Sequence, residues 1–309
     1  MTSISFGLQL PTFDPFRVGG GPTFLQAARL AEQAGFDAVW AGDHLAAPAS
    51  NYEPTVVLAA VAAMTGRLSL GFGVLLLGLR NAAWAAKQMQ AIDAMAPGRL
   101  RLGVGVGGEF PQEFEAVGLS TRQRGALLDR ALEAMPALLQ GRETDMRALD
   151  GIAPVHVPAL RPPVHALPPV YVGGRGEPSM NRAARFGDWW MPTWLSAEQL
   201  AKRALRLGEL ADQHGRAQTP RIALVLGAHI DEDKTRARAH ATAYTRGMYG
   251  LPFERVEKWT AYGPASRVAE LVSEVVEAGV EEIVFTLMSD DPLTQVERLE
   301  TVVRLCCRQ

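Results

Sequence analysis

Two kinds of hydrophobic pattern alternate along this chain. Short apolar runs, rich in β-branched side chains, are each followed by a longer segment in which apolar residues recur at helical spacing. In the first pair, residues 3–11 predict a strand, and residues 22–34 predict a helix that ends at Gly35. The predicted strands cover residues 3–11, 36–41, 68–76, 99–106, 169–173, 188–191, 221–229 and 282–287. The predicted helices cover residues 22–34, 53–64, 82–96, 121–139, 178–186, 196–214, 266–278 and 293–306.

Strict alternation of strands and helices predicts a parallel sheet. Eight such units favour a closed (β/α)8 barrel, the TIM barrel, over an open doubly wound sheet, which usually has fewer strands. Two segments interrupt the alternation. Residues 141–168 are rich in proline and arginine and predict an inserted loop with a short hairpin, whereas residues 231–262 predict a charged, mostly helical insertion. We expect residues 1–309 to form a single barrel domain with these two insertions.

The strand at residues 99–106 ends in glycines. Gly107 and Gly108 remove side chains from its carboxyl end, so a flat ligand or another backbone can approach closely. Charged and aromatic side chains then follow on a predicted loop: Glu109, Phe110, Glu113 and Phe114. In a parallel barrel the functional groups lie on the loops after the strands, which makes this segment a candidate site. Tight packing of a strand against a helix explains the glycines alone equally well.

Asp43 and His44 follow the second predicted strand, at the same end of the barrel. Histidine exchanges protons near neutral pH, so His44 is a candidate general acid or base. The alternative is a structural role, in which His44 caps a helix or binds a loop carbonyl. One histidine beside one carboxylate is too small a set for a metal site, and we expect no metal.

Gly173-Gly-Arg-Gly176 follows the fifth predicted strand and opens a helix at Pro178. Its glycines expose backbone N–H groups at a helix N-terminus, and Arg175 adds a positive charge. This combination is suited to binding a phosphate, although an ordinary turn remains the alternative. Of the nearby tryptophans, Trp189 and Trp190 are expected in the core, and Trp194 on a loop is a candidate wall of a substrate pocket.

Composition excludes several functional classes. A formal net charge of −2 argues against nucleic acid or an anionic membrane surface as the partner. The apolar runs are too short to cross a membrane, and no secretory signal precedes the first strand. The two cysteines, Cys306 and Cys307, are adjacent and suggest no disulfide framework, which fits a cytoplasmic protein. The chain has no GxSxG or HExxH motif, so serine hydrolase and zinc peptidase chemistry are unsupported.

Several stretches together resemble one family, the luciferase-like monooxygenase superfamily of flavin- and deazaflavin-dependent enzymes. They are Ala31–His44, Glu53-Pro54, Met64–Gly71, Leu79–Asn81 with Lys87, Ala96–Gly105, Glu113–Gly118, Arg124-Gly125, Pro169–Arg175, Ala183–Trp189, and Tyr262–Ala265. The resemblance covers almost the whole chain and is loose only in the two insertions. It implies a (β/α)8 barrel with an isoalloxazine-like ring at its mouth.

The resemblance also implies roles for individual residues. Gly73-Val74 resembles the position of a non-prolyl cis peptide that backs the ring in deazaflavin enzymes. Asp43 and His44 correspond to the acid pair near ring and substrate, with His44 moving the proton. The ring's other edge would be lined by Gly107, Gly108 and Glu109, and the cofactor phosphate would be held by Gly173, Gly174, Arg175 and Gly176. Family members often form homodimers through the helices near the second and third strands.

The implied activity is hydride transfer between coenzyme F420 and a small organic substrate. The Gly-Gly-Arg and Gly-Gly-Glu-Phe loops resemble the deazaflavin branch more than the flavin branch. The alternative is an FMN-dependent monooxygenase that uses O2 and a separate reductase partner, and a non-catalytic binding protein is a third reading. The sequence Leu45-Ala-Ala-Pro48 departs from the aromatic-rich stretch of the sugar-phosphate dehydrogenases, so we do not predict a sugar phosphate as the substrate.

Overall fold

Eight parallel strands form a closed barrel at the centre of the molecule. The structure is a computed structural model in which residues 4–17 and 23–306 are described. The strands are β1 (Ser5–Gln9), β3 (Ala38–Ala41), β5 (Ser69–Phe72), β6 (Leu100–Val104), β9 (Val170–Gly173), β10 (Trp189–Met191), β11 (Arg221–Ile230) and β13 (Glu282–Leu287). They pair in the order β10-β9-β6-β5-β3-β1-β13-β11, and parallel pairing of β10 with β11 closes the ring. The predicted (β/α)8 barrel is confirmed.

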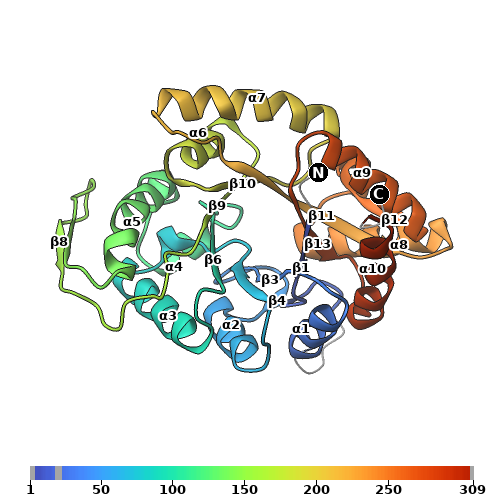
Figure 1. Cartoon of the computed structure of the whole chain (residues 1–309), viewed down its shortest axis with the longest axis horizontal. Helices are drawn as coiled ribbons and strands as arrows, with labels where there is room; N and C mark the ends of the chain where they lie inside the picture. Colours follow the sequence, from blue (N-terminus) through green and yellow to red (C-terminus); the bar gives the residue numbers. More distant parts are fainter. Residues whose placement is uncertain (1–3, 18–22, 307–309) are drawn as a thin grey trace.

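Helices surround this barrel (Figure 1). They are α1 (Phe24–Gln33), α2 (Pro54–Ala62), α3 (Ala82–Met95), α5 (Arg124–Leu139), α6 (Glu177–Phe186), α7 (Ala197–Gln213), α9 (Ala265–Glu277) and α10 (Pro292–Cys306). Local sequence sets where several of them begin. Asn81 accepts hydrogen bonds from two N–H groups at the start of α3, and Ser196 forms a capping box with Gln199 at the start of α7.

Both predicted insertions are present. The first contains a hairpin of β7 (Thr144–Met146) and β8 (Val155–Val157), which stands away from the barrel at the left of Figure 1. The second contains α8 (Lys234–Tyr249), the 3₁₀ turns η3 (Phe253–Arg255) and η4 (Glu257–Trp259), and β12 (Ala261–Gly263). Strand β12 pairs with the end of β11, which places α8 beside the carboxyl ends of the barrel strands.

The expectation of a loop at Glu113 and Phe114 was wrong. These residues lie in α4 (Gln112–Ala116), a five-residue helix in which both side chains are buried. A single helical turn is too short to show a hydrophobic period, which explains the error. Further short elements are η1 (Leu77–Leu79), η2 (Thr121–Gln123), and an antiparallel pair of β2 (Phe13–Asp14) and β4 (Ser50–Asn51).

Aromatic and charged side chains fill the barrel interior. Trp189 stacks on Tyr171, and the Tyr171 hydroxyl donates to the carboxylate of Glu282, which is fully buried. Arg101 Nη1 lies 2.8 Å from the same carboxylate and compensates its burial. Trp189 and Trp190 are core residues as predicted. Cys306 packs partly buried against the core, whereas Cys307 lies outside the described residues.

Candidate active site

His44 is held by a buried carboxylate. Its Nδ1 atom lies 3.1 Å and 3.2 Å from the two oxygens of Glu113, whose side chain is fully buried. One of these oxygens also accepts the backbone N–H groups of Leu45 and Ala46, at 2.7 Å and 3.0 Å. Since a carboxylate accepts, Nδ1 is the donor, and Nε2 remains for a reacting group. Glu113 therefore orients the imidazole and fixes the loop that carries it.

Two aromatic rings flank His44. The ring of Phe110 lies 5.0 Å from the imidazole and that of Phe13 lies 6.0 Å away, both in edge-to-face arrangements. Asn51 Nδ2 donates to the His44 carbonyl at 2.6 Å. The His44 side chain is 17% exposed, so part of it still reaches solvent.

Asp43 has different partners. Its carboxylate accepts from Arg80 Nη2 at 2.7 Å and from the backbone N–H of Leu76 at 2.9 Å. Arg80 also bonds to Glu53, which caps α2. Burial is the largest single influence on the pKa of Arg80 and lowers it, but the interactions with Asp43 and Glu53 together outweigh burial and raise the pKa above its ordinary value. Asp43 and His44 are thus neighbours in sequence whose side chains bond to different groups.

Val74 follows β5 and packs partly buried against the barrel cluster that contains Trp40 and Tyr171. The Gly73–Val74 peptide is cis, and Gln9 Nε2 donates to the Gly73 carbonyl at 3.0 Å. A Cβ at Gly105 would lie 2.6 Å from one Val74 methyl, and a Cβ at Gly173 would lie 3.0 Å from the other. The glycines at the ends of β6 and β9 therefore make room for the Val74 side chain.

The segment after β6 faces the helical insertion. Gly107 and Gly108 have positive φ, and the exposed Glu109 follows them. Partial burial of Tyr249, which remains 41% exposed, together with the negative charge of Glu109, raises the pKa of Tyr249 to about 12. Glu109 thus lies near the end of α8. The Tyr249 ring packs edge-to-face against Trp194, at 5.2 Å, and the role of Trp194 as a wall of a substrate pocket stays a prediction.

The loop Gly173–Gly176 leads into α6 as predicted. Gly174 has φ +114°, and its carbonyl accepts the indole N–H of Trp190 at 2.7 Å. The backbone N–H groups of Arg175 and Gly176 donate to no other group in the described part of the chain. Two free donors at a helix N-terminus, with an exposed arginine between the glycines, suit an anion such as phosphate.

A basic groove of about 700 Å³ adjoins this loop between α6 and α7. Its charged residues are Arg175, Lys202, Arg203 and Arg206, with the carboxylates Glu177 and Glu209. Arg206 bonds to both carboxylates, at 2.7 Å and 2.6 Å. Within the described residues, Lys202 and Arg203 form no ion pair, so the groove keeps an excess of positive charge next to the loop.

A histidine pair joins the end of β11 to α8: His229 lies on the strand and His240 on the helix. The buried His229 donates from Nδ1 to the Met288 carbonyl at 3.0 Å and stacks on His240. Burial lowers the pKa of His229, so its ring is neutral near pH 7. Across residues 4–17 and 23–306, no group of three or more His, Cys, Asp or Glu side chains is arranged to hold a metal. The same residues contain no helix that is long and apolar enough to cross a membrane.

The sequence missed Glu113 and Arg80 as residues of this site. Glu113 is one of four charged or aromatic residues after the glycines, and only its contact with His44 separates it from Glu109 and Glu115. No local signal separates Glu113 from its neighbours, because Glu115 is also adjacent to Phe114 and is exposed. Arg80 had no signal of its own beyond its place in the family-like stretch at residues 79–81.

Known proteins are similar to this chain in both sequence and structure. F420-dependent glucose-6-phosphate dehydrogenase of Beutenbergia cavernae is 29% identical over 294 residues, which are 89% of this chain and 82% of that protein. An F420-dependent secondary alcohol dehydrogenase, solved with an F420-acetone adduct, superimposes with a TM-score of 0.84 at 17% identity and covers 98% of this chain and 99% of its own. The monooxygenase RslO1 of Streptomyces bottropensis superimposes with a TM-score of 0.81 at 23% identity, covering 99% of this chain and 98% of its own.

The family assignment rests on the sequence itself. The model of the family described as luciferase-like monooxygenase matches residues 8–280, which contain six of the eight barrel strands and the end of β1, whereas β13 follows the matched segment. The matched segment also contains His44, Glu113 and the loop Gly173–Gly176. The chain therefore belongs to the luciferase-like monooxygenase family.

Proposed function

We propose that this protein is an F420-dependent oxidoreductase that moves a hydride between the deazaflavin and a small organic substrate. The observation that carries the proposal is the bond between His44 and Glu113 at the barrel mouth. It leaves Nε2 of an oriented imidazole available for a proton. The F420-dependent relatives in the family add support.

The barrel mouth fits a cofactor with a flat ring and a phosphate. The loop Gly173–Gly176 has two unbonded N–H donors among the described residues, and the Val74 side chain packs over Gly105 and Gly173, where a ring could lie against it. In the proposal this loop holds the phosphate, Gly73 and Val74 back the ring, and Gly107, Gly108 and Glu109 line its edge. When bound, a deazaflavin supplies hydride transfer and does not activate oxygen.

The basic groove favours F420 over FMN. F420 continues beyond its phosphate into a chain of γ-linked glutamates, whereas FMN ends at the phosphate. Lys202 and Arg203 lie beyond the phosphate loop, where FMN has no group to meet them. Carboxylates placed there would gain from charges that have no partner among the described side chains.

The chain's own residues have three tasks in this reaction. His44 gives or takes the proton at Nε2, because Glu113 holds Nδ1. Phe13 and Phe110 exclude water from the imidazole, which strengthens its interaction with a bound hydroxyl or carbonyl oxygen. We assign Asp43 to positioning, since its ion pair with Arg80 ties the His44 loop to the segment before α3.

Titration of the cofactor-free protein with F420 and with FMN, followed by fluorescence, tests the proposal. We expect F420 to bind at least tenfold more tightly than FMN. Tighter binding of FMN, with O2 consumption on reduction, would identify a monooxygenase and call for a reductase partner. Binding of neither cofactor would contradict the assignment of the phosphate loop.

We also propose a homodimer that forms through α2 and α3. Val56 on α2 and Trp84 on α3 are 68% and 71% exposed, and α2 has apolar residues on all sides. A helix that is apolar all round is normally buried on both faces. Sedimentation of the wild type and of Trp84→Glu tests this: the wild type should sediment as a dimer and the variant as a monomer.

A further inference from the structure

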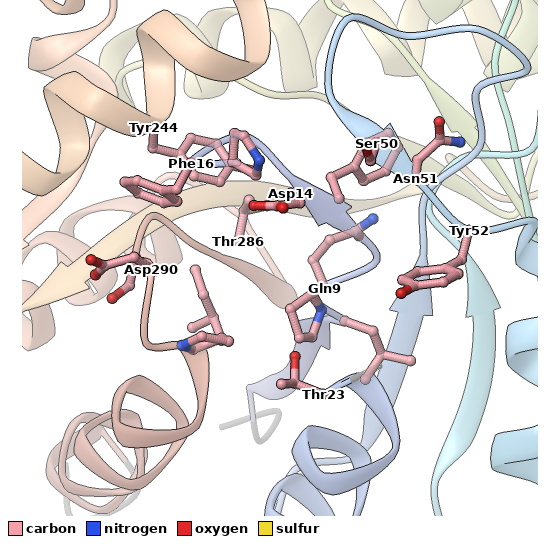
Figure 2. A pocket seen from close by; sticks show the side chains of 17 residues that line it. Gln9, Asp14, Phe16, Thr23, Ser50, Asn51, Tyr52, Tyr244, Thr286 and Asp290 are labelled. Atoms are coloured by element: carbon pink, nitrogen blue, oxygen red, sulfur yellow. The ribbon is translucent and has the colours of Figure 1, made fainter. Parts of the chain in front are cut away.

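A cavity lies beside the candidate active site, at the carboxyl ends of β1 and β13. Its volume is about 460 Å³, within the range of small-molecule pockets. Four segments line it: the end of β1, the β2 and β4 ladder, Tyr244 of α8, and the loop between β13 and α10 (Figure 2). Its lining residues belong neither to the phosphate loop nor to the basic groove. The cofactor contacts proposed above therefore do not account for this cavity.

The Phe13 ring joins the cavity to the candidate active site. It lines the cavity and lies 6.0 Å from the imidazole of His44, in an edge-to-face arrangement. It also packs on Gly42, where a Cβ would lie 2.7 Å from the ring. Asn51, another lining residue, donates to the His44 carbonyl. A molecule in the cavity therefore shares the Phe13 ring with the residue that we assign to proton transfer.

Tyr244 brings a buried hydroxyl to this cavity. The residue is 8% exposed, and its hydroxyl forms no hydrogen bond with another described residue. A buried tyrosine hydroxyl normally has a partner, because the loss of water without a replacement bond costs free energy. The hydroxyl is not among the unbonded side-chain atoms that the described residues close off from solvent, so it is accessible from the cavity that Tyr244 lines. Burial raises the pKa of Tyr244 well above its ordinary value, so the phenol keeps its proton and acts as a donor.

A charged ligand has no counterion in the lining. The lining residues include no lysine, arginine or histidine that would pair with an anion. Both carboxylates of the lining are already engaged, since Asp290 contacts His240 Nδ1 at 3.3 Å and Asp14 has a partner within the chain. Neither carboxylate is therefore free for an ammonium group, and a charge buried without a partner is costly. The lining thus favours an uncharged ligand over an anion or a cation.

Apolar and aromatic side chains form the larger part of the lining. Figure 2 shows Phe16 beside Tyr244 on one side of the cavity and Tyr52 on the other. The Phe16 and Tyr244 rings are 6.1 Å apart and tilted by 59°. Leu10 and Leu287 add aliphatic surface. A ring system that enters such a space gains free energy from the removal of its apolar surface from water.

We propose that this cavity binds an uncharged ring of the substrate, whose oxygen atom accepts a hydrogen bond from the Tyr244 hydroxyl, while the reacting group lies beyond Phe13 at His44. A carbonyl or ether oxygen meets the requirement, because it accepts a hydrogen bond and carries no charge. The assignment of this ring to the substrate rests on the function proposed above. The recognition of an uncharged acceptor rests on the cavity alone.

Equilibrium dialysis of the cofactor-free protein against four naphthalene probes tests the proposal. The probes are 2-acetonaphthone, 2-ethylnaphthalene, 2-naphthoate and 2-naphthylmethylammonium, which share one ring system and differ in the substituent. We expect the ketone to bind several-fold more tightly than the hydrocarbon, because only the ketone accepts the hydrogen bond from Tyr244. We expect the ketone to bind about tenfold or more tightly than either ion, because neither ion has a free counterion in the cavity.

Tyr244→Phe removes only the hydroxyl. It should lower the affinity for the ketone to that for the hydrocarbon and leave the affinity for the hydrocarbon unchanged. Tyr249→Phe is the matched control, because Tyr249 lies on the same helix but does not line the cavity. Thermal unfolding provides a second measurement: loss of a hydroxyl that has no partner in the described structure should not lower the midpoint. A lower midpoint for Tyr244→Phe would show that the hydroxyl is engaged inside the protein and would contradict the proposal.

Equal binding of the ketone and the hydrocarbon by the wild type would overturn the proposal, as would tighter binding of either ion. No binding of any probe, or an equal loss in Tyr249→Phe, would also overturn it. Because the probes are offered without cofactor, the result is independent of the F420 titration. Ketone binding without F420 binding would contradict the proposed reaction, and F420 binding without a preference for the ketone would contradict only this inference.

Discussion

The imidazole of His44 and the carboxylate of Glu113 meet at 3.1 Å although 69 positions separate them in the sequence. Glu113 is fully buried, and its oxygens also accept two backbone N–H groups of the His44 loop. A buried acceptor with this many donors fixes its partner's tautomer as well as its orientation. The bond therefore makes α4 part of the candidate active site.

Replacement of His44 by alanine should reduce kcat by about 10²–10⁴-fold, the usual contribution of a positioned general acid or base. Affinity for the cofactor should change less than about threefold, because His44 is not part of the phosphate loop. Steady-state kinetics and a cofactor titration measure the two effects separately. An unchanged kcat would remove His44 from the proton transfer.

Glu113→Gln should reduce kcat by about tenfold or more, and less than His44→Ala does. The amide has one acceptor oxygen where the carboxylate has two, so the ring and the loop N–H groups compete for it. Glu115→Gln is the control, since Glu115 is exposed on the same short helix. Equal kinetics for the two variants would show that Glu113 does not orient His44.

Gly174→Ala should weaken cofactor binding by about tenfold. Its φ of +114° disfavours any residue with a Cβ, and that Cβ would lie 3.0 Å from Ser179. The loop would shift to relieve this strain, and its backbone N–H groups, which we propose bind the cofactor phosphate, would shift with it. Gly118→Ala is matched for positive φ but meets no atom within 4 Å, so it should lower stability without changing affinity for the cofactor.

Reversal of charge in the basic groove should weaken the binding of F420 and leave the binding of FMN unchanged. The double variant Lys202→Glu and Arg203→Glu should bind F420 about tenfold less tightly or worse, with a smaller effect at high salt. Binding of FMN should not change, because FMN has no charged group beyond its phosphate. Arg29→Glu, on the exposed face of α1, is the control. An equal loss of affinity for F420 and FMN would show that the variant disturbs the phosphate loop and not a separate site for the rest of F420.

Stability should fall as the pH decreases from 7 to 5. Burial lowers the pKa of His229 in the folded protein, so the unfolded chain binds more protons below about pH 6.5. The free energy of unfolding then decreases with pH, by at most about 1.4 kcal/mol per pH unit for this one group. Urea unfolding of the wild type and of His229→Gln measures it. The variant should show a flatter pH dependence below pH 7.

The barrel followed from local patterns, whereas part of the site did not. Apolar runs and helical spacing are properties of single segments, and they placed all eight strands within a few residues. The bond between His44 and Glu113 depends on a helix of one turn that has no period to detect. The ion pair of Asp43 and Arg80 and the cavity near Asp290 form only when distant loops meet at the barrel mouth.

The resemblance to a known family added what local patterns could not provide. The pair Gly73 and Val74 has no distinguishing composition, yet the family pattern singled it out, and its peptide is cis. The same pattern drew attention to Asp43 as part of an acid pair. Contacts that the pattern did not predict include the tilted rings of Phe16 and Tyr244, 6.1 Å apart.

The packing of Val74 makes three distant positions dependent on one another. Its two methyl groups occupy the space that a Cβ at Gly105 or Gly173 would need. Replacement of Gly105 or Gly173 by alanine should therefore destabilise the protein when residue 74 is valine. The same replacement should be better tolerated when residue 74 is smaller. Because of this coupling, these three positions cannot change independently in evolution. A family member with a larger residue at one of them is expected to have a compensating change at another.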